Sequence, residues 1–344
     1  MLLIIILHIL NFSISSILPI YNSEMFSNLP YPLYITFLQI FLAVPFLLLI
    51  AWFSNNFHFS WMIPPKSAVL KLLVSSLFYG FMMFTGNFGF YVSSVDFAVL
   101  FRLSTPIFST ILGILFLNEK LNTIGIISMI FVFTGILFLS FNFQWSQSKM
   151  PSFFQCIIQL IAVLSSALSG FTFKIASKEL EKYYMKNAQI TIMVWRFLFG
   201  SLPVLFSSLY IEPGIWSNLE FVNDTRLFKW VFAGVFITLL FQFINTYLSR
   251  KTTLITMSVV IQMKFIPSLI ISHIVFHETK WNFQQLIGMV ILTLGVLLYS
   301  FSRAISKDKD KDKKKSNDAT ISEKFIAIET DQENSKDEFE ISEN

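Results

Sequence analysis

Two apolar stretches of the sequence each hold one cation and, a few residues later, a proline. The first covers 94–106 and contains Arg102, and the second covers 256–267 and contains Lys264. A full charge inside a membrane segment is costly, so it usually marks a solute pathway or a binding site. The planar fork of Arg and the compact charge of Lys both suit phosphate or carboxylate. The pair therefore predicts a cavity that binds a phosphorylated or otherwise anionic solute.

Neutral side chains lie within a few helical turns of the two cations and could complete the cavity: Asn87, Tyr91, Ser258 and Gln262. We expect no Asp or Glu deep enough to pair with the cations, so an anion from elsewhere should compensate them. Pro106 and Pro267 should mark helix bends used in alternating access, because a proline ring disturbs helix hydrogen bonding.

A third embedded cation, Arg196, supports two interpretations. It lies only about two turns from the predicted end of its helix, where a long side chain can extend to the membrane surface. Substrate binding and this structural role explain Arg196 equally well, and it is kept here as a candidate binding residue.

The composition predicts an integral membrane protein. Of 344 residues, 54% are hydrophobic and only 13% are charged, against about a quarter charged in ordinary soluble domains. A spanning helix needs roughly 20 mostly apolar residues. The sequence offers ten such segments, which predict an all-α fold: 2–20, 32–53, 68–90, 95–117, 123–142, 152–173, 188–210, 228–249, 253–276 and 282–302.

Matching features recur five helices apart, so we expect two repeats, at about 1–145 and 150–303. The fourth and ninth helices share the cation and the proline, and the third and eighth share an asparagine followed by Tyr-x-Ser. Because five is odd, the second copy must be inverted, an arrangement typical of transporters with a site near the midplane.

The Lys and Arg of short loops place both termini in the cytoplasm. Residues 304–344, highly charged and poor in apolar residues, should form a disordered cytoplasmic tail.

The sequence contains no pattern of an enzyme. It has no Gly-rich nucleotide-binding loop followed by Lys-Ser/Thr and no His-Glu-x-x-His, and Cys156 is the only cysteine. We therefore expect neither a metal nor another cofactor, and no nucleic-acid partner. Exchange of one anion for another fits best, because the cations then never lack a counter-ion during reorientation.

Several motifs resemble the triose-phosphate and nucleotide-sugar transporter branch of the drug/metabolite transporter superfamily. The resemblance covers about 20–300: Ile-Tyr-Asn at 20–22, the run 97–106, where Arg102 stands in place of the family's Lys, Leu-Asn-Glu-Lys at 117–120, and Thr-Met-Ser-Val at 256–259 followed by Lys264. It implies a ten-helix transporter with Arg102 and Lys264 at the phosphates.

Other positions depart from the plastid sugar-phosphate exchangers. Phe265 stands where those proteins have a second ninth-helix cation, and Met83 where they have a histidine. The loss of these two phosphate-facing groups argues against a small triose phosphate as the substrate. The pattern looks closest to the nucleotide-sugar-transporter-like members of solute-carrier family 35.

The sequence thus predicts a Golgi or ER antiporter that exchanges a nucleotide sugar for a nucleoside monophosphate and that could form a homodimer. Two alternatives stay open. One is a sugar-phosphate/phosphate antiporter, and the other is a transport-inactive membrane scaffold or regulator of the secretory pathway.

Overall fold

The structure is a computed structural model, and it describes residues 2–54, 63–93, 95–141, 152–182, 188–217, 225–264, 267, 283–284 and 286–302. Within these residues every regular element is a helix, and none is a strand. The elements are α1 (Leu2–Asn28), α2 (Pro32–Ser54), α3 (Lys66–Val92), α4 (Val95–Arg102), α5 (Thr105–Leu117), α6 (Thr123–Phe141), α7 (Phe153–Lys182), α8 (Ala188–Ile211), α9 (Pro213–Ser217), α11 (Thr225–Lys251), α12 (Leu254–Val260) and the 3₁₀ helix η2 (Ile261–Lys264). A further helix without a label covers Leu286–Ser302.

Five of the described helices are long and apolar enough to cross a membrane, namely α2, α3, α7, α8 and α11. Large apolar side chains on the outside of the bundle are exposed, among them Leu115, Phe116, Phe206 and Phe228. Such exposed apolar surface is unusual for a soluble protein and suits contact with lipid chains. The all-helical prediction thus agrees with the described part of the chain.

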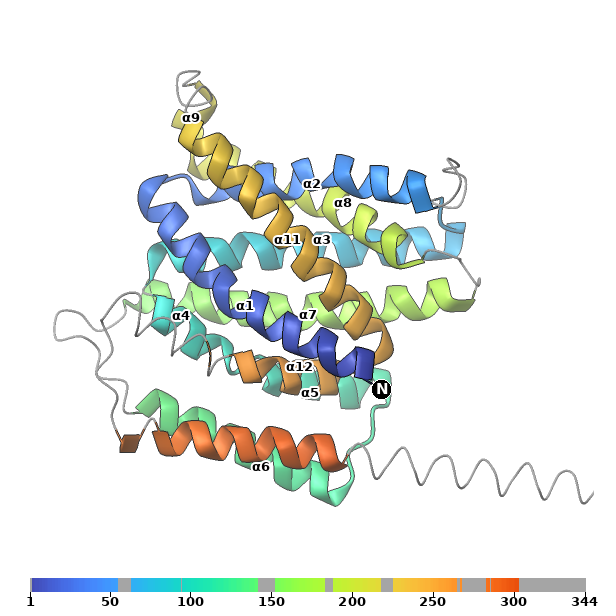
Figure 1. The fold of residues 1–344 in the computed structure, drawn as a ribbon, viewed down its shortest axis with the longest axis vertical. Helices are drawn as coiled ribbons and strands as arrows, with labels where there is room; N and C mark the ends of the chain where they lie inside the picture. The colour runs from blue at the N-terminus through green and yellow to red at the C-terminus, as the bar shows by residue number, and fades with distance from the viewer. Residues whose placement is uncertain are drawn as a thin grey trace, which may run out of the picture.

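Helix α3 lies in the middle of the bundle and packs most extensively against α7 and α8. Helix α2 packs against α8, and α1 lies alongside α11 (Figure 1). The main apolar core lies between α1, α2, α3, α8 and α11, and a second core joins α6 and the helix Leu286–Ser302 to α12. Because α3 contacts so many neighbours, its polar side chains are held in fixed positions.

Close contact between α3 and α8 depends on two glycines. A Cβ atom added to Gly80 would lie 2.2 Å from the carbonyl oxygen of Gly200, and one added to Gly200 would lie 2.8 Å from Cδ1 of Tyr79. No side chain fits between the helices at this crossing. The pair therefore sets the position of α3 relative to α8.

The segment 95–117, predicted as one helix, is broken in the structure. Helix α4 ends at Arg102, a turn occupies Leu103 and Ser104, and α5 begins at Thr105 with Pro106 in its first turn. Proline suits a first turn, because its missing N–H would have no helical partner there. The bend predicted from Pro106 is thus a complete helix break, which places Arg102 at a helix end.

The segment predicted as a helix over 253–276 begins as α12 and tightens into η2 at Ile261. Pro267 is helical, but its neighbours, the side chain of Lys264 and the predicted tail 304–344 lie outside the described residues. Helix α7 is longer than the prediction of 152–173, since it continues to Lys182.

Charged side chains cap helices at the corners of the bundle. The Glu119 carboxylate, just after α5, accepts the N–H groups of Leu254 (2.8 Å) and Ile255 (3.1 Å) at the start of α12. Lys174 of α7 donates to the carbonyl oxygen of Ser249 (2.6 Å) near the end of α11. A carboxylate at a helix start and an ammonium at a helix end both interact favourably with the helix dipole. These contacts therefore stabilise the corner between α11 and α12.

Glu212, just after α8, caps α2 in the same way. Its carboxylate accepts the N–H groups of Leu33 (3.0 Å) and Tyr34 (2.8 Å). Burial raises the pKa of the Glu212 carboxyl, and the two backbone hydrogen bonds oppose that shift only in part. This contact ties the end of α8 to the start of α2.

Candidate functional site

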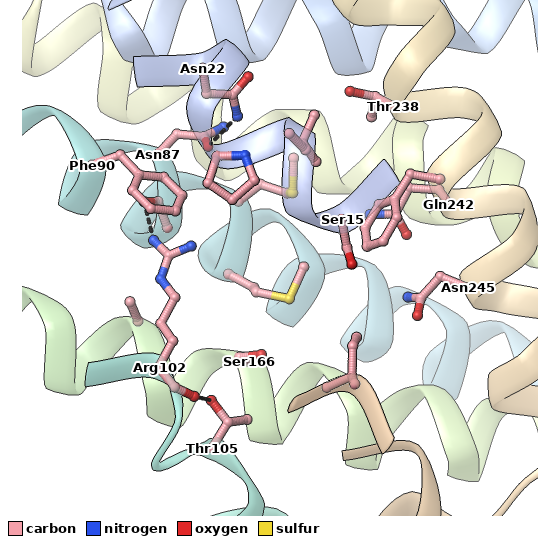
Figure 2. Close-up of a pocket in the computed structure, with 18 of the residues that line it drawn as sticks. Ser15, Asn22, Asn87, Phe90, Arg102, Thr105, Ser166, Thr238, Gln242 and Asn245 are labelled. Atoms are coloured by element: carbon pink, nitrogen blue, oxygen red, sulfur yellow. Dashed lines mark hydrogen bonds between the residues drawn. The ribbon is translucent and has the colours of Figure 1, made fainter. Parts of the chain in front are cut away.

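A cavity of about 220 Å³ lies among α1, α2, α3, α7, α11, η2 and the break between α4 and α5. Figure 2 shows most of its lining residues. The full lining is Ser15, Leu18, Pro19, Asn22, Gln39, Met82, Met83, Gly86, Asn87, Phe90, Arg102, Leu103, Thr105, Ala162, Ser166, Thr238, Phe241, Gln242, Asn245, Ile261 and Gln262. Among these described residues Arg102 is the one charged side chain.

Arg102 extends from the broken end of α4 along one side of the cavity (Figure 2). Its guanidinium lies 3.8 Å above the ring of Phe90, and Nη2 donates to the carbonyl oxygen of Gly86. Both partners are on α3. Among the ion pairs of the described residues, none joins Arg102 to a carboxylate. The cation is therefore held by neutral groups, and Nε of Arg102 is buried without a hydrogen-bond partner.

Asn87 forms the centre of a hydrogen-bond chain beside Arg102. Its Oδ1 accepts from Nδ2 of Asn22 on α1 (3.2 Å), and its Nδ2 donates to Oγ1 of Thr36 on α2 (2.8 Å). Thr36 donates in turn to the carbonyl oxygen of Pro32 (2.6 Å). The chain fixes the orientation of the Asn87 amide and joins three helices at the cavity.

Gln262 of η2 also lines the cavity, where its Nε2 donates to the carbonyl oxygen of Ser258 (3.0 Å). Ser258 itself is buried in α12 and donates back to the carbonyl oxygen of Ile255 (2.9 Å), so it is not part of the lining. The backbone of Lys264 follows two residues after Gln262 in η2. Its side chain lies outside the description.

Two further predicted site residues lie away from the cavity. Tyr91 of α3 is 47% exposed and is not among the lining residues. Arg196 is buried between α3, α7 and α8, where Nη2 donates to Oγ of Ser169 (2.8 Å) and the guanidinium lies over the rings of Tyr79 (4.4 Å) and Phe173 (5.0 Å). The structure thus brings together Arg102, Asn87 and Gln262, but not Tyr91, Ser258 or Arg196.

The sequence reasoning missed the polar face of α11. Thr238, Gln242 and Asn245 line the cavity, and their spacing of four and three residues puts them on one helix face. Figure 2 shows them on the side of the cavity away from Arg102, with Ser15 of α1 close by. Polar residues at this spacing in an otherwise apolar spanning segment were a signal that could have found them.

Nothing in the described part of the chain suggests a metal site. No group of three or more His, Cys, Asp or Glu side chains there could hold a metal ion. The polar groups of the cavity are amides, hydroxyls and one guanidinium, which suit an organic anion.

Apolar helices of spanning length around a polar cavity with an embedded cation define a multi-pass membrane protein with a solute site. The sequence profile of the Triose-phosphate Transporter family matches residues 2–300. The chain belongs to this family. The family predicted from the motifs is confirmed.

One curated relative is the UDP-N-acetylglucosamine transporter slc35b4 of Dictyostelium discoideum, 24% identical over 229 residues. The match covers 60% of this chain and 63% of that relative. A solved crystal structure matches with a TM-score of 0.60 at 13% identity, over 87% of this chain and 97% of the other. This second match supports the fold alone.

Proposed function

We propose that the protein is a secondary transporter that exchanges a nucleotide sugar for a nucleoside monophosphate across a Golgi or ER membrane by alternating access. The observation that carries this proposal is the Arg102 guanidinium at the side of an amide-lined cavity, without a carboxylate partner among the described residues. A guanidinium binds phosphate through two parallel hydrogen bonds. Here it would hold a phosphate group of either exchanged solute.

Exchange follows from the cost of the embedded charge. A cation that crosses the membrane midplane without an anion is expensive, whereas a bound phosphate accompanies it in both directions of an antiport cycle. Carboxylate-coupled proton or sodium transport would need an acidic residue in the cavity, and none of the described lining residues is acidic. The relative named as a UDP-N-acetylglucosamine transporter supports a nucleotide sugar as the solute.

The contacts between helices support the proposed inverted repeats. The proposed repeats pair α1 with α7, α2 with α8 and α3 with α11. A contact between two helices should then recur between their two counterparts. Helix α3 packs on α7 as α11 packs on α1, and α3 packs on α8 as α11 packs on α2. Likewise, α4 contacts α7 as η2 contacts α1. Ten spans in two inverted five-helix units would give this pattern.

In this proposal the two interrupted helices carry the binding residues. Arg102 at the end of α4 and Lys264 at the end of η2 would hold the phosphates, with Asn87 and Gln262 as neutral partners. The break before Pro106 and a bend at Pro267, which the sequence predicts, would absorb the change of conformation. The surroundings of Arg196 and Ser258 favour structural roles for these two, and Tyr91 lies outside the cavity lining.

The test is exchange by the full chain in proteoliposomes. Vesicles are loaded in turn with UMP, GMP, CMP or phosphate, and uptake of labelled nucleotide sugars and sugar phosphates is followed. We expect stimulation by one nucleoside monophosphate, its loss in Arg102→Gln, and partial activity in Arg102→Lys, which keeps the charge. Stimulation by phosphate alone would favour a sugar-phosphate antiporter. No exchange under any loading by folded protein would refute the transport cycle and favour the scaffold.

A further inference from the structure

The cavity has a second polar side, formed by one face of α11 with a contribution from α1. Thr238, Gln242 and Asn245 of α11 and Ser15 of α1 line it, and Figure 2 shows them across the cavity from Arg102. Thr238 and Gln242 are 3% and 4% exposed. Their polar groups are therefore largely removed from solvent and available mainly to something inside the cavity.

This side has unused hydrogen-bonding capacity. Oδ1 of Asn245 is buried and has no hydrogen-bond partner, and the same is true of both amide atoms of Asn11, one turn before Ser15 on α1. Asn11 lies between Leu7 and Ile14, which pack against the apolar cluster that includes Ile244 of α11. Buried polar groups in proteins are normally hydrogen-bonded, so the unpaired Oδ1 of Asn245 in the cavity lining indicates a ligand with a matching donor. Asn11 is not itself a lining residue.

The chemistry of this side differs from that around Arg102. An amide offers both a donor and an acceptor, and a hydroxyl does the same. These groups match the hydroxyls of a sugar or the amide edge of a nucleobase, but they supply no positive charge for a phosphate. Apolar lining residues such as Leu18, Met82 and Met83 complete the cavity. It thus has a charged side and a neutral hydrogen-bonding side.

We propose that the α11 face, comprising Thr238, Gln242 and Asn245, is the subsite that recognises the uncharged ring of the solute while Arg102 holds its phosphate. This inference rests on the proposed function, and it adds a set of residues that would determine which ring is accepted. Because the face is neutral, the ring it selects carries hydroxyl or amide groups and no charge.

The expected effect of removing one amide is about tenfold in affinity, which corresponds to about 1.4 kcal/mol and is typical of a single hydrogen bond. Gln242→Met removes the amide and keeps a side chain of similar length. Asn245→Leu and Thr238→Val similarly preserve shape. Thr246→Val is the matched control, because Thr246 is equally buried on α11 but does not line the cavity.

The experiment measures ligand-dependent thermal stabilisation of the purified full chain with nucleoside monophosphates, hexose 1-phosphates, nucleotide sugars and pyrophosphate, which has no ring. We expect Gln242→Met to raise the half-maximal concentration of ring-bearing ligands about tenfold and to leave that of pyrophosphate unchanged. Arg102→Gln should weaken the binding of all these ligands, pyrophosphate included. A loss confined to nucleoside monophosphates would assign the face to the base, and one confined to hexose 1-phosphates would assign it to the sugar.

Unchanged affinity for ring-bearing ligands in Gln242→Met, Asn245→Leu and Thr238→Val would overturn the subsite, and so would an equal loss for pyrophosphate. If one variant fails to fold, the other two decide, and Thr238→Val changes the shape least. A wild-type protein that responds to none of these ligands would instead refute the proposed function. The two failures are thus distinguishable.

Discussion

The glycine pair at the crossing of α3 and α8 gives a sharp test of the packing that positions the cavity. In Gly80→Ala the new Cβ would lie 2.2 Å from the carbonyl oxygen of Gly200. Ordinary contacts begin near 3.4 Å, so the helices would have to separate by about 1 Å, and overpacking of this kind costs about 1–3 kcal/mol. The gain in helix propensity from Gly to Ala, about 1 kcal/mol, offsets part of this cost.

Gly86→Ala is the matched control on the same helix. Its Cβ would meet nothing closer than Nη2 of Arg102 at 3.6 Å, which is ordinary contact, so only the gain in propensity remains. The two variants should therefore differ by about 1–3 kcal/mol in stability. At about 2–4 °C per kcal/mol for domains of a few hundred residues, we expect Gly80→Ala to melt about 2–12 °C below Gly86→Ala.

The assay is thermal denaturation of the detergent-solubilised full chain, followed by size-exclusion chromatography with fluorescence detection. Equal melting temperatures for Gly80→Ala and Gly86→Ala would refute the close crossing of α3 and α8. A melting temperature of Gly80→Ala above that of the wild type would refute it even more strongly.

Three further predictions concern residues outside the cavity. Glu119→Gln should lower the melting temperature, because loss of a charged helix cap costs about 1 kcal/mol. Ser169→Ala leaves the buried Arg196 guanidinium without its hydroxyl partner; it should destabilise the protein by about 1.5–3 kcal/mol and leave the apparent affinity for the transported solute unchanged. Because burial holds the pKa of Glu212 above its ordinary value, the folded state binds its proton more tightly than the unfolded state, so stability should rise as pH falls through that pKa. Glu212→Gln should weaken this rise, as measured by melting temperatures between pH 5 and 8.

Arg102 and the helical character of the described chain could be predicted from the sequence, because an embedded charge and long apolar runs are local features. Arg196 has the same charge in a similar setting, yet its partners Ser169, Tyr79 and Phe173 come from other helices. The sequence around Arg196 does not reveal these contacts. A long-range packing contact, rather than residue type, decides which cation faces the cavity.

The polar face of α11 and the helix break after Arg102 illustrate two other limits. Gln242 and Asn245 carry no charge, so their cost in an apolar segment is smaller and their signal weaker than that of a cation. Pro106 indicated a bend, but proline is equally at home in the first turn of a new helix. Leu103, in the turn between α4 and α5, packs in the second apolar core, and this long-range contact is not visible in the local sequence.

The most direct test of the account is the coupling ratio of the two fluxes in one vesicle. Proteoliposomes with the wild-type chain are loaded with one labelled nucleoside monophosphate, and a nucleotide sugar with a second label is added outside. We predict one molecule out for each molecule in. Arg102→Gln should lose both fluxes together, since loss of a charged hydrogen bond worth about 2–3 kcal/mol weakens binding about 30- to 150-fold. Equal uptake into empty vesicles, or full exchange by Arg102→Gln, would contradict the account.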